Sequence, residues 1–356
     1  MPRYRRSALL PAVLLGAGVV LTGVGLGWGV PRVDQGGVGA GDVLGVVALV
    51  LGAVGLALGV VGLIRATPGW WWLVTVPVLL LAVVVGVYVL AVPVAVAFPA
   101  RQPVDADPPP TVEEVTVPTA DGERLAGWFA PSAGGAAVVL LPGAGSTRDA
   151  VVDHMAVLDA GGYAVLALDP RGHGRSTGRG MEWGWYGETD VADAVNYLQA
   201  REEVDADRIA VIGLSMGGEQ AIGAAAADER IRAVVAEGVT ARQAHDLHWL
   251  SDAYGWRGAL TEGLHHATSA IADVLSPASP PPTLRSAAAA AAPTPILLIA
   301  AGTVRDEQEA AADIQRAAPD SVTVWTVPGG GHITGLDTDP AGWSRTVLGV
   351  LDAAIG

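Results

Sequence analysis

The chain of 356 residues contains no cysteine and no lysine, and these absences narrow the chemistry it can perform. Without cysteine there is no disulfide framework, no thiolate nucleophile and no cysteine-based metal site. The formal net charge is −15, and all 21 basic residues are arginine. Nucleic acid is not an expected partner, because contacts to phosphate require clustered basic side chains.

Charge is also scarce in the first hundred residues, which are mostly Val, Leu, Gly and Ala. Three apolar runs, at residues 7–30, 43–64 and 70–98, are each long enough to cross the roughly 30 Å hydrocarbon core of a membrane as a helix. None contains a charged side chain, so ion or proton transport is not expected. The sequence predicts a membrane anchor of three transmembrane helices in residues 1–100.

Arginines set the expected orientation of this anchor. Arg3, Arg5 and Arg6 precede the first run, and Arg65 follows the second. The positive-inside rule then places the N-terminus in the cytoplasm and everything after about residue 101 outside it. A cleavable signal peptide would explain the first run but not the other two.

Small and aromatic residues add two expectations for the anchor. Trp70 and the two tryptophans after it predict contact with the lipid headgroup zone. Gly52, Gly55, Gly59 and Gly62 recur at helical spacing and predict a close contact between helices.

A proline-rich stretch at residues 101–111 predicts a semi-rigid linker. Beyond it, short apolar runs alternate with helical patterns through residues 112–356. This alternation predicts an α/β domain whose mostly parallel sheet is covered on both faces and carries its site at the carboxyl ends of the strands. Besides the strand that ends at Gly213, the expected strands lie at residues 115–117, 124–130, 137–141, 163–168, 231–236, 295–301 and 322–327.

One strand ends in Gly213-Leu-Ser215-Met-Gly217, and an alanine-rich helical pattern follows at once. Such a sharp turn crowds the serine backbone, so the positions two before and two after it must be small. The turn holds the Ser215 hydroxyl above the sheet edge, where a base can reach it and a helix N-terminus can stabilise negative charge. With 47 glycines in the chain a chance match is a real alternative, and the flanking strand and helix argue against it.

The chain resembles the α/β-hydrolase superfamily over most of residues 112–356, and bacterial membrane-anchored hydrolases of the esterase and serine-peptidase-like kind in particular. The resemblance implies the α/β-hydrolase fold, a triad in the order serine, acid, histidine, and no cofactor or metal. Four motifs in order carry it: Leu141-Pro-Gly-Ala-Gly145, Asp169-Pro-Arg-Gly-His-Gly-Arg-Ser176, the serine turn, and Gly331-His332.

A serine hydroxyl needs a base, and the resemblance points to His332, which follows the last strand in a glycine-rich loop. His173 is the competing base, although related proteins use its turn to shape a loop. The expected oxyanion-hole donors are the backbone N–H groups of Met216 and Ala144. Related enzymes often carry a histidine at the position of Pro142. The proline of this chain removes the hydrogen bonds of that side chain but leaves the backbone donors intact.

The acid stays open among three carboxylates. Relatives commonly carry an aspartate three residues after a glycine beyond the strand ending at residue 301, but Arg305 stands there. Asp306 is the first choice, Glu307 the nearest alternative and Glu237 the third. Each also has an ordinary interpretation: a helix cap, a charge in a first helical turn, and a satisfied pocket carboxylate, respectively.

Residues 238–293 are too many for an ordinary connection and predict a helical cap over the site. Trp249, Tyr254 and Trp256 are expected to shape an acyl or leaving-group pocket there. Two histidine pairs also lie in this insertion, but no metal site is expected because no recognised catalytic metal motif accompanies them. The pairs are His245 with His248 and His265 with His266.

These features predict a membrane-anchored serine hydrolase, in which Ser215 attacks an ester or amide carbonyl and water releases an acyl-enzyme. Ester cleavage ranks above peptide cleavage, since no pocket for a charged peptide terminus is recognisable. The alternatives are a serine peptidase and a non-catalytic binding module that keeps the fold. The expected partners are a small-molecule or peptide acyl substrate and membrane lipid.

Overall fold

The computed structural model describes residues 8–33 and 39–356. Arg3, Arg5 and Arg6, on which the expected membrane orientation depends, lie outside the described residues. The orientation therefore stays a prediction.

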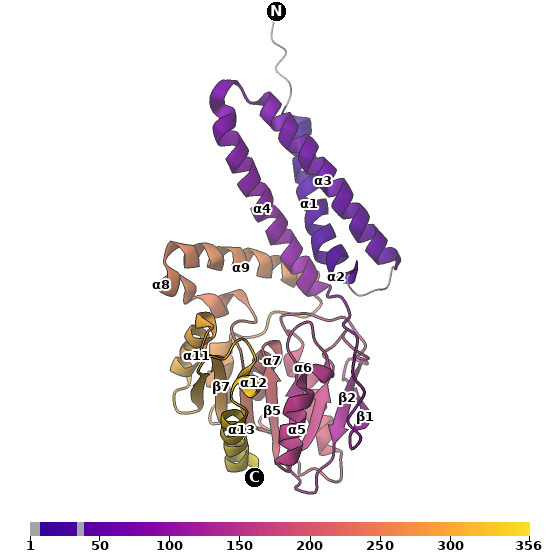
Figure 1. The fold of residues 1–356 in the computed structure, drawn as a ribbon, viewed down its shortest axis with the longest axis vertical. Coiled ribbons are helices and arrows are strands. Elements are labelled where there is room, and N and C mark those ends of the chain that lie inside the picture. The colour runs from indigo at the N-terminus through magenta and orange to yellow at the C-terminus, as the bar shows by residue number, and fades with distance from the viewer. Residues whose placement is uncertain (1–7, 34–38) are drawn as a thin grey trace, which may run out of the picture. The chain divides into compact units, whose positions relative to one another are not determined.

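The first of two compact units contains three long apolar helical segments, each long and apolar enough to cross a membrane (Figure 1). The units comprise residues 1–100 with 267–277, and residues 101–266 with 278–356. The helical segments of the first hundred residues are α1 (Leu9–Val24), the π-helical turn η1 (Gly25–Gly29), α2 (Val30–Val33), α3 (Ala40–Ala66), η2 (Gly69–Trp71) and α4 (Trp72–Ala97).

Glycines bring α1 and α3 together through their backbones. A Cβ atom on Gly52 would lie 2.5 Å from the backbone nitrogen of Thr22, and Gly55, Gly59 and Gly62 also face α1 at close range. Larger side chains there would force the helices apart. The predicted close contact between helices is confirmed.

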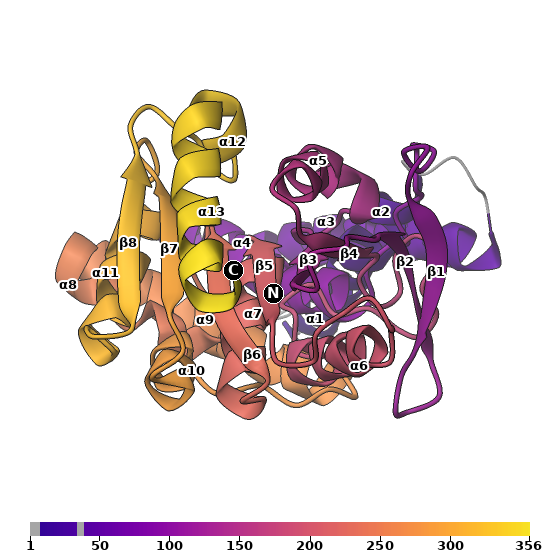
Figure 2. The ribbon, with the colours of Figure 1, turned by 90° about the horizontal axis from the view of Figure 1, so that it is seen from below.

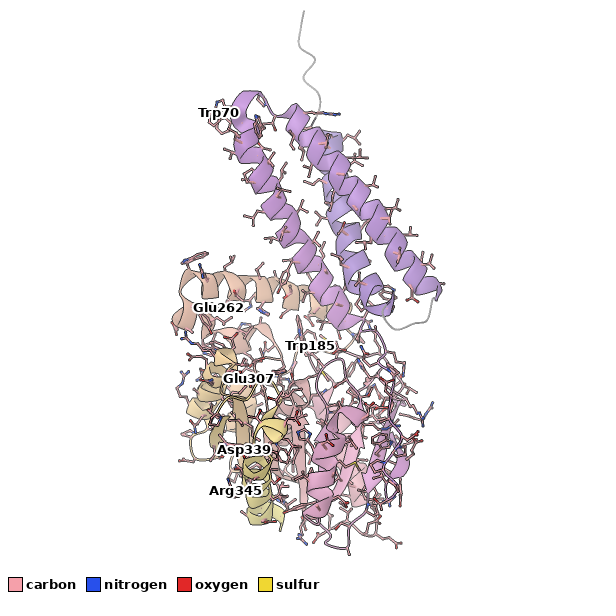
Figure 3. All side chains as sticks on the ribbon, in the orientation of Figure 1. Trp70, Trp185, Glu262, Glu307, Asp339 and Arg345 are labelled. Carbon is pink, nitrogen blue, oxygen red and sulfur yellow. The ribbon has the colours of Figure 1, made fainter. Side chains whose placement is uncertain are left out.

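The tryptophans before α4 are exposed. Trp70 and Trp71 stack with their ring centroids 4.8 Å apart, and Trp70 stands at the turn that leads into α4 (Figure 3). Their contact with lipid headgroups stays a prediction.

The second unit is built on an eight-stranded sheet in the order β1-β2-β4-β3-β5-β6-β7-β8. Strand β2 runs antiparallel to both of its neighbours, and all other neighbours are parallel. The strands are β1 (Glu113–Pro118), β2 (Arg124–Ala130), β3 (Ala137–Leu141), β4 (Ala164–Leu168), β5 (Ile209–Leu214), β6 (Ile231–Glu237), β7 (Ile296–Ala301) and β8 (Val322–Val327).

Helices cover both faces of this sheet (Figure 2). One face packs against α6 (Gly187–Gln199), α7 (Met216–Ala227), α10 (Leu284–Ala291) and α11 (Arg305–Ala317), and the other against α5 (Val152–Ala160) and α13 (Pro340–Ile355). The shorter segments are η3 (Arg148–Val151), η4 (Ala244–Leu247), α8 (Leu250–Tyr254) and α12 (Gly335–Thr338), and α9 (Trp256–Leu275) completes the set. The predicted mostly parallel sheet, covered on both faces, is confirmed, and its central strands are apolar and buried.

The insertion between β6 and β7 differs from the expected cap at residues 238–293. Its last helix, α10, buries Leu284, Ala288 and Ala291 in the core beside the sheet. Asp246 accepts the N–H of Leu284 at 2.6 Å and so holds the start of that helix. An alanine-rich face is small enough to pack closely against α7, which places α10 in the covering layer. Only η4, α8 and α9 are left for a cap.

The predicted linker does not run free at its start. Arg101 Nη1 donates to the carbonyl oxygens of Gly174 and Ser176, at 2.9 and 2.6 Å. The N–H of Gly174 donates to the carbonyl of Gln102 at 2.7 Å. The beginning of residues 101–111 is therefore bound to the sheet domain.

Candidate active site

Ser215 is the single residue between β5 and α7, and its backbone is strained. It has φ 51° and ψ −120°, which residues other than glycine rarely adopt. Its N–H donates to the carbonyl of Glu237 at 2.7 Å, which fixes the turn to β6. The hydroxyl is thus presented at the carboxyl end of the sheet.

The glycines around Ser215 are sterically required. A Cβ atom on Gly213 would lie 2.1 Å from the carbonyl carbon of Gly217, and one on Gly217 would lie 2.5 Å from the carbonyl oxygen of Leu141. Real Cβ contacts are essentially never that short. The predicted need for small residues on both sides of the serine is confirmed.

Two hydrogen bonds link Ser215 to a buried carboxylate through His332. Ser215 Oγ lies 3.1 Å from His332 Nε2, and His332 Nδ1 lies 2.7 Å from Glu307 Oε1. The Glu307 side chain is 1 % exposed, and its second oxygen accepts the N–H of Ala301 at 2.8 Å. A carboxylate on Nδ1 favours the tautomer that carries its proton there, which leaves Nε2 able to accept the hydroxyl proton.

The expectation that Asp306 contacts His332 is wrong. Asp306 is exposed and accepts a hydrogen bond from the Tyr254 hydroxyl at 2.5 Å. Successive residues of a helix point about 100° apart, so two neighbours cannot both face the histidine. Glu307, the nearest alternative, takes the position.

A pattern within α11 identifies the inward carboxylate. Glu307, Ala310, Ala311 and Ile314 are buried and recur at the spacing of one helix face. Asp306 lies off that face. Reading the apolar face of this helix, in place of counting from the glycine before it, would have selected Glu307.

Glu237, the third candidate acid, supports the histidine loop from below the site. Its two oxygens accept the N–H of Gly335 at 2.7 Å and the indole N–H of Trp343 at 2.9 Å. Burial raises the pKa of this carboxyl, against the effect of these two donors. Glu237 is therefore a carboxylate whose two oxygens are both hydrogen-bonded, which is the structural alternative that the sequence offered for it.

The competing base, His173, is buried in the loop after β4. Its Nε2 lies 2.8 Å from the Glu182 carboxylate, and its Nδ1 lies 3.2 Å from the carbonyl oxygen of Arg171. In the same loop, Asp169 is fully buried and its Oδ2 lies 2.5 Å from Arg148 Nη1. These contacts shape the loop and leave His173 engaged away from Ser215.

The pKa of His332 is raised above its ordinary value, chiefly by the hydrogen bond to Glu307 and against the effect of burial. Glu219 and Glu237 add to this rise through their negative charges. The arrangement therefore favours the imidazolium that forms when Nε2 takes a proton.

The two predicted oxyanion-hole donors lie in suitable segments. Met216 is the first residue of α7, so its N–H has no acceptor within the helix. Ala144 follows Gly143, where an added Cβ atom would lie 3.4 Å from Ser215 Cβ, so this loop borders Ser215. The role of both N–H groups stays a prediction.

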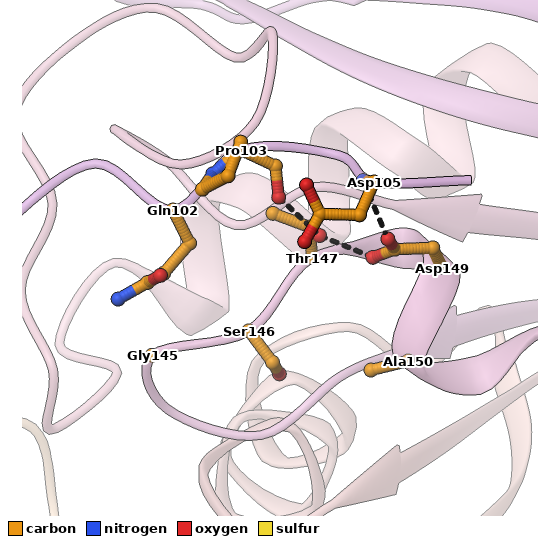
Figure 4. A pocket seen from close by; sticks show the side chains of 8 residues that line it. All are labelled: Gln102, Pro103, Asp105, Gly145, Ser146, Thr147, Asp149 and Ala150. Carbon is orange, nitrogen blue, oxygen red and sulfur yellow. Dashed lines mark hydrogen bonds between the residues drawn. The ribbon is translucent and has the colours of Figure 1, made fainter. Parts of the chain in front are cut away.

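Residues 101–105 contact the segment after β3 at Thr147 and Asp149 (Figure 4). Thr147 Oγ1 donates to the carbonyl of Pro103 at 3.2 Å, and the N–H of Asp105 donates to Asp149 at 2.8 Å. A cavity of about 280 Å³ lies beside these contacts. It is lined by Gln102, Pro103, Asp105, Gly145, Ser146, Thr147, Asp149 and Ala150.

The aromatic residues expected to shape a pocket have varied surroundings. Trp249 packs with Leu247, Leu250 and Ala310 in a small apolar cluster, whereas Trp256 is 74 % exposed. On the neighbouring loop, Trp185 is buried and donates its indole N–H to the carbonyl of Arg242 at 2.7 Å (Figure 3). Trp249 and Trp185 are therefore held in the domain, whereas Trp256 faces solvent.

The rings of His245 and His248 make different contacts in the insertion. His245 and His266 meet edge to face with centroids 4.7 Å apart, while His248 lies 3.5 Å from Asp313. Over residues 8–33 and 39–356, no group of three or more histidine and carboxylate side chains is placed to hold a metal ion.

In a comparison with known proteins, the model of the alpha/beta hydrolase family matches residues 138–345. An uncharacterised protein of Mycobacterium tuberculosis is 35% identical over 119 residues, which are 33% of this chain and 42% of that protein. A thiohydrolase of Aspergillus aculeatus is 33% identical over 134 residues, 35% of this chain and 41% of that protein. The chain thus spans less than half the length of these curated relatives.

Among solved structures, an esterase of Pyrococcus furiosus superposes with a TM-score of 0.56 at 21% identity, over 72% of this chain and 100% of that one. This likeness concerns the fold. With the family match across more than half of its residues, the chain belongs to the alpha/beta hydrolase family.

Proposed function

We propose that the protein is a membrane-anchored serine hydrolase that cleaves a carboxylic ester through an acyl-enzyme on Ser215. The observation that carries the proposal is the hydrogen-bond path from Ser215 Oγ through His332 to Glu307. In this reaction His332 Nε2 takes the hydroxyl proton while Oγ bonds to the carbonyl carbon. His332 then gives that proton to the leaving alkoxide as the acyl–oxygen bond breaks.

Water completes the cycle by the same route. His332 removes a proton from the water that attacks the acyl-enzyme, and it returns this proton to Ser215 Oγ as the carboxylic acid leaves. The N–H groups of Met216 and Ala144 stabilise the oxyanion of both tetrahedral intermediates. No cofactor takes part.

An ester is favoured over an amide as the substrate. Two of the proteins similar to this chain are named as an esterase and a thiohydrolase, which supports an oxygen or sulfur ester. Against the non-catalytic alternative stands the strained serine turn together with a fully hydrogen-bonded histidine. A binding module requires neither feature.

Labelling by a fluorophosphonate probe tests the nucleophile. The detergent-solubilised full chain is expected to be labelled on Ser215, whereas Ser215→Ala is expected to remain unlabelled, because the probe phosphonylates only an activated serine. Ser344→Ala, on the surface of α13, serves as the matched control and is expected to label like the wild type. Equal labelling of wild type and Ser215→Ala, or of neither, would falsify the proposal.

The three apolar helical segments support a membrane anchor, and the arginines of the sequence favour a hydrolase domain outside the cytoplasm. Because the chain has no cysteine, single cysteines report the topology cleanly. In intact cells, Asp107→Cys is expected to react with a membrane-impermeant thiol reagent. Thr67→Cys, between α3 and α4, is expected to react only after lysis. The opposite pattern rejects this orientation.

A further inference from the structure

Glu219 is a buried carboxylate on the helix of the nucleophile, and the proposed reaction leaves it without a role. It lies four residues after Ser215 in α7 and is 5 % exposed. Its Oε1 accepts the N–H of Thr240 at 3.0 Å and the N–H of Ala241 at 2.9 Å. Burying a carboxylate is costly unless it is hydrogen-bonded, so this residue is explained by what it holds.

The segment that Glu219 holds, residues 238–241, leaves β6 and lies against the histidine loop. Gly238 has φ +73°, and a Cβ atom there would lie 3.1 Å from both Cε1 and Nδ1 of His332. The same atom would lie 2.8 Å from Cγ2 of Ile333, a β-branched residue whose own φ is 50°. The backbone at Gly238 therefore packs closely against the imidazole, and a shift of residues 238–241 would move His332.

Arg242 holds the C-terminal end of this segment by hydrogen bonds. Its Nη2 lies 2.7 Å from both oxygens of Glu188, and its Nη1 donates to the backbone carbonyl of Glu219 at 3.1 Å. Asp246 accepts the N–H of Arg242 at 3.1 Å. Residues 238–242 are thus pinned to α6 and α7 at several points.

The charges around Glu219 oppose one another. Burial raises its pKa to about 7, Asp246 adds to the rise, and Arg242 and the two N–H donors work against it. Its negative charge in turn raises the pKa of His332, together with the charges of Glu307 and Glu237.

We propose that Glu219 is a positioning residue for the Ser215–His332 pair, which holds residues 238–241 against the imidazole and supports the imidazolium with its negative charge. The inference rests on the proposed hydrolase function. Glu219 touches neither the substrate nor the reacting atoms in this scheme. It acts on His332 through the backbone of Gly238 and through the electrostatic field of the Glu219 carboxylate.

The test compares wild type, Glu219→Gln, Glu219→Ala and the exposed control Glu202→Gln. In each, kcat and KM for p-nitrophenyl butyrate and the rate constant of fluorophosphonate labelling are measured against pH. Glutamine keeps an oxygen acceptor and loses the charge, so the acid limb of the pH–rate profile of Glu219→Gln is expected at lower pH than that of wild type. On the plateau at higher pH, kcat of this variant is expected to lie within about threefold of wild type. Alanine loses the acceptor, and its kcat is expected to fall about 10- to 100-fold with KM nearly unchanged.

The wild-type limb is also expected to be broader than that of Glu219→Gln, because two interacting groups titrate there and only one remains in the variant. The inference is overturned if the acid limb of Glu219→Gln lies at the same pH as that of wild type and Glu219→Ala loses no kcat. Ser215→Ala in the same assay separates the two proposals. If it hydrolyses the ester like wild type, the hydrolase proposal fails, whatever the Glu219 variants do.

Discussion

Replacing Glu307 with glutamine is expected to lower kcat by about 10⁴-fold. An amide can present its N–H to His332 Nδ1, which moves the imidazole proton to Nε2 and leaves no acceptor for the Ser215 hydroxyl. It also removes the negative charge that stabilises the imidazolium. The measurement is steady-state hydrolysis of p-nitrophenyl butyrate by the solubilised full chain.

Asp306→Asn is the matched control, since it makes the same chemical change one residue earlier. Asp306 is exposed and bonded to Tyr254, so kcat is expected to stay within about twofold of wild type. Loss of activity in Asp306→Asn, with Glu307→Gln active, would reject the assignment of the acid.

The pH profile of Glu307→Gln gives a second check. His332 must be neutral to accept a proton, so the rate falls as pH drops through its pKa. Glu307 raises that pKa in the folded protein, and the acid limb of wild type therefore lies above that of an ordinary histidine. Without the carboxylate, the residual activity of Glu307→Gln is expected to persist to lower pH.

Replacing His332 with alanine is expected to have the largest effect, a loss of about 10⁶-fold in kcat. No other base is hydrogen-bonded to Ser215 Oγ among the described residues, so the hydroxyl keeps its proton. Residual catalysis by the oxyanion hole is expected to stay roughly 10³–10⁴ above the reaction in water. Fluorophosphonate labelling is expected to be lost with it.

His266→Ala controls for the loss of an imidazole. His266 is exposed and packs edge to face on His245, so its removal is expected to leave kcat unchanged. A His332→Ala variant that retained a tenth or more of wild-type kcat would be incompatible with its proposed role.

Much of this site could be predicted from the sequence because its signals are local. Gly213 and Gly217 mark the turn at Ser215 since no larger residue fits beside it, and a glycine-rich loop after the last strand marks His332. The sheet was predictable for the same reason, because each central strand is an unbroken apolar run.

The carboxylate that contacts His332 was predicted wrongly because a spacing rule counts residues along the chain, whereas the direction of a side chain depends on where its helix begins. Helix α11 begins at Arg305, and its apolar face passes through Glu307 and not Asp306. Contacts between distant residues leave no local pattern at all. The hydrogen bond of Arg101 to Gly174 spans 73 positions, so the attachment of the linker could be seen only in the fold.

The strained backbone at Ser215 bears on why the chain keeps a serine there. Glycine adopts such a conformation without steric cost, whereas a residue with a side chain carries a penalty of roughly 1–3 kcal/mol. Selection for a stable fold alone would favour glycine at this turn. The proposed role of Ser215 as nucleophile accounts for a hydroxyl at this position, because glycine would relieve the strain but could not attack a carbonyl carbon.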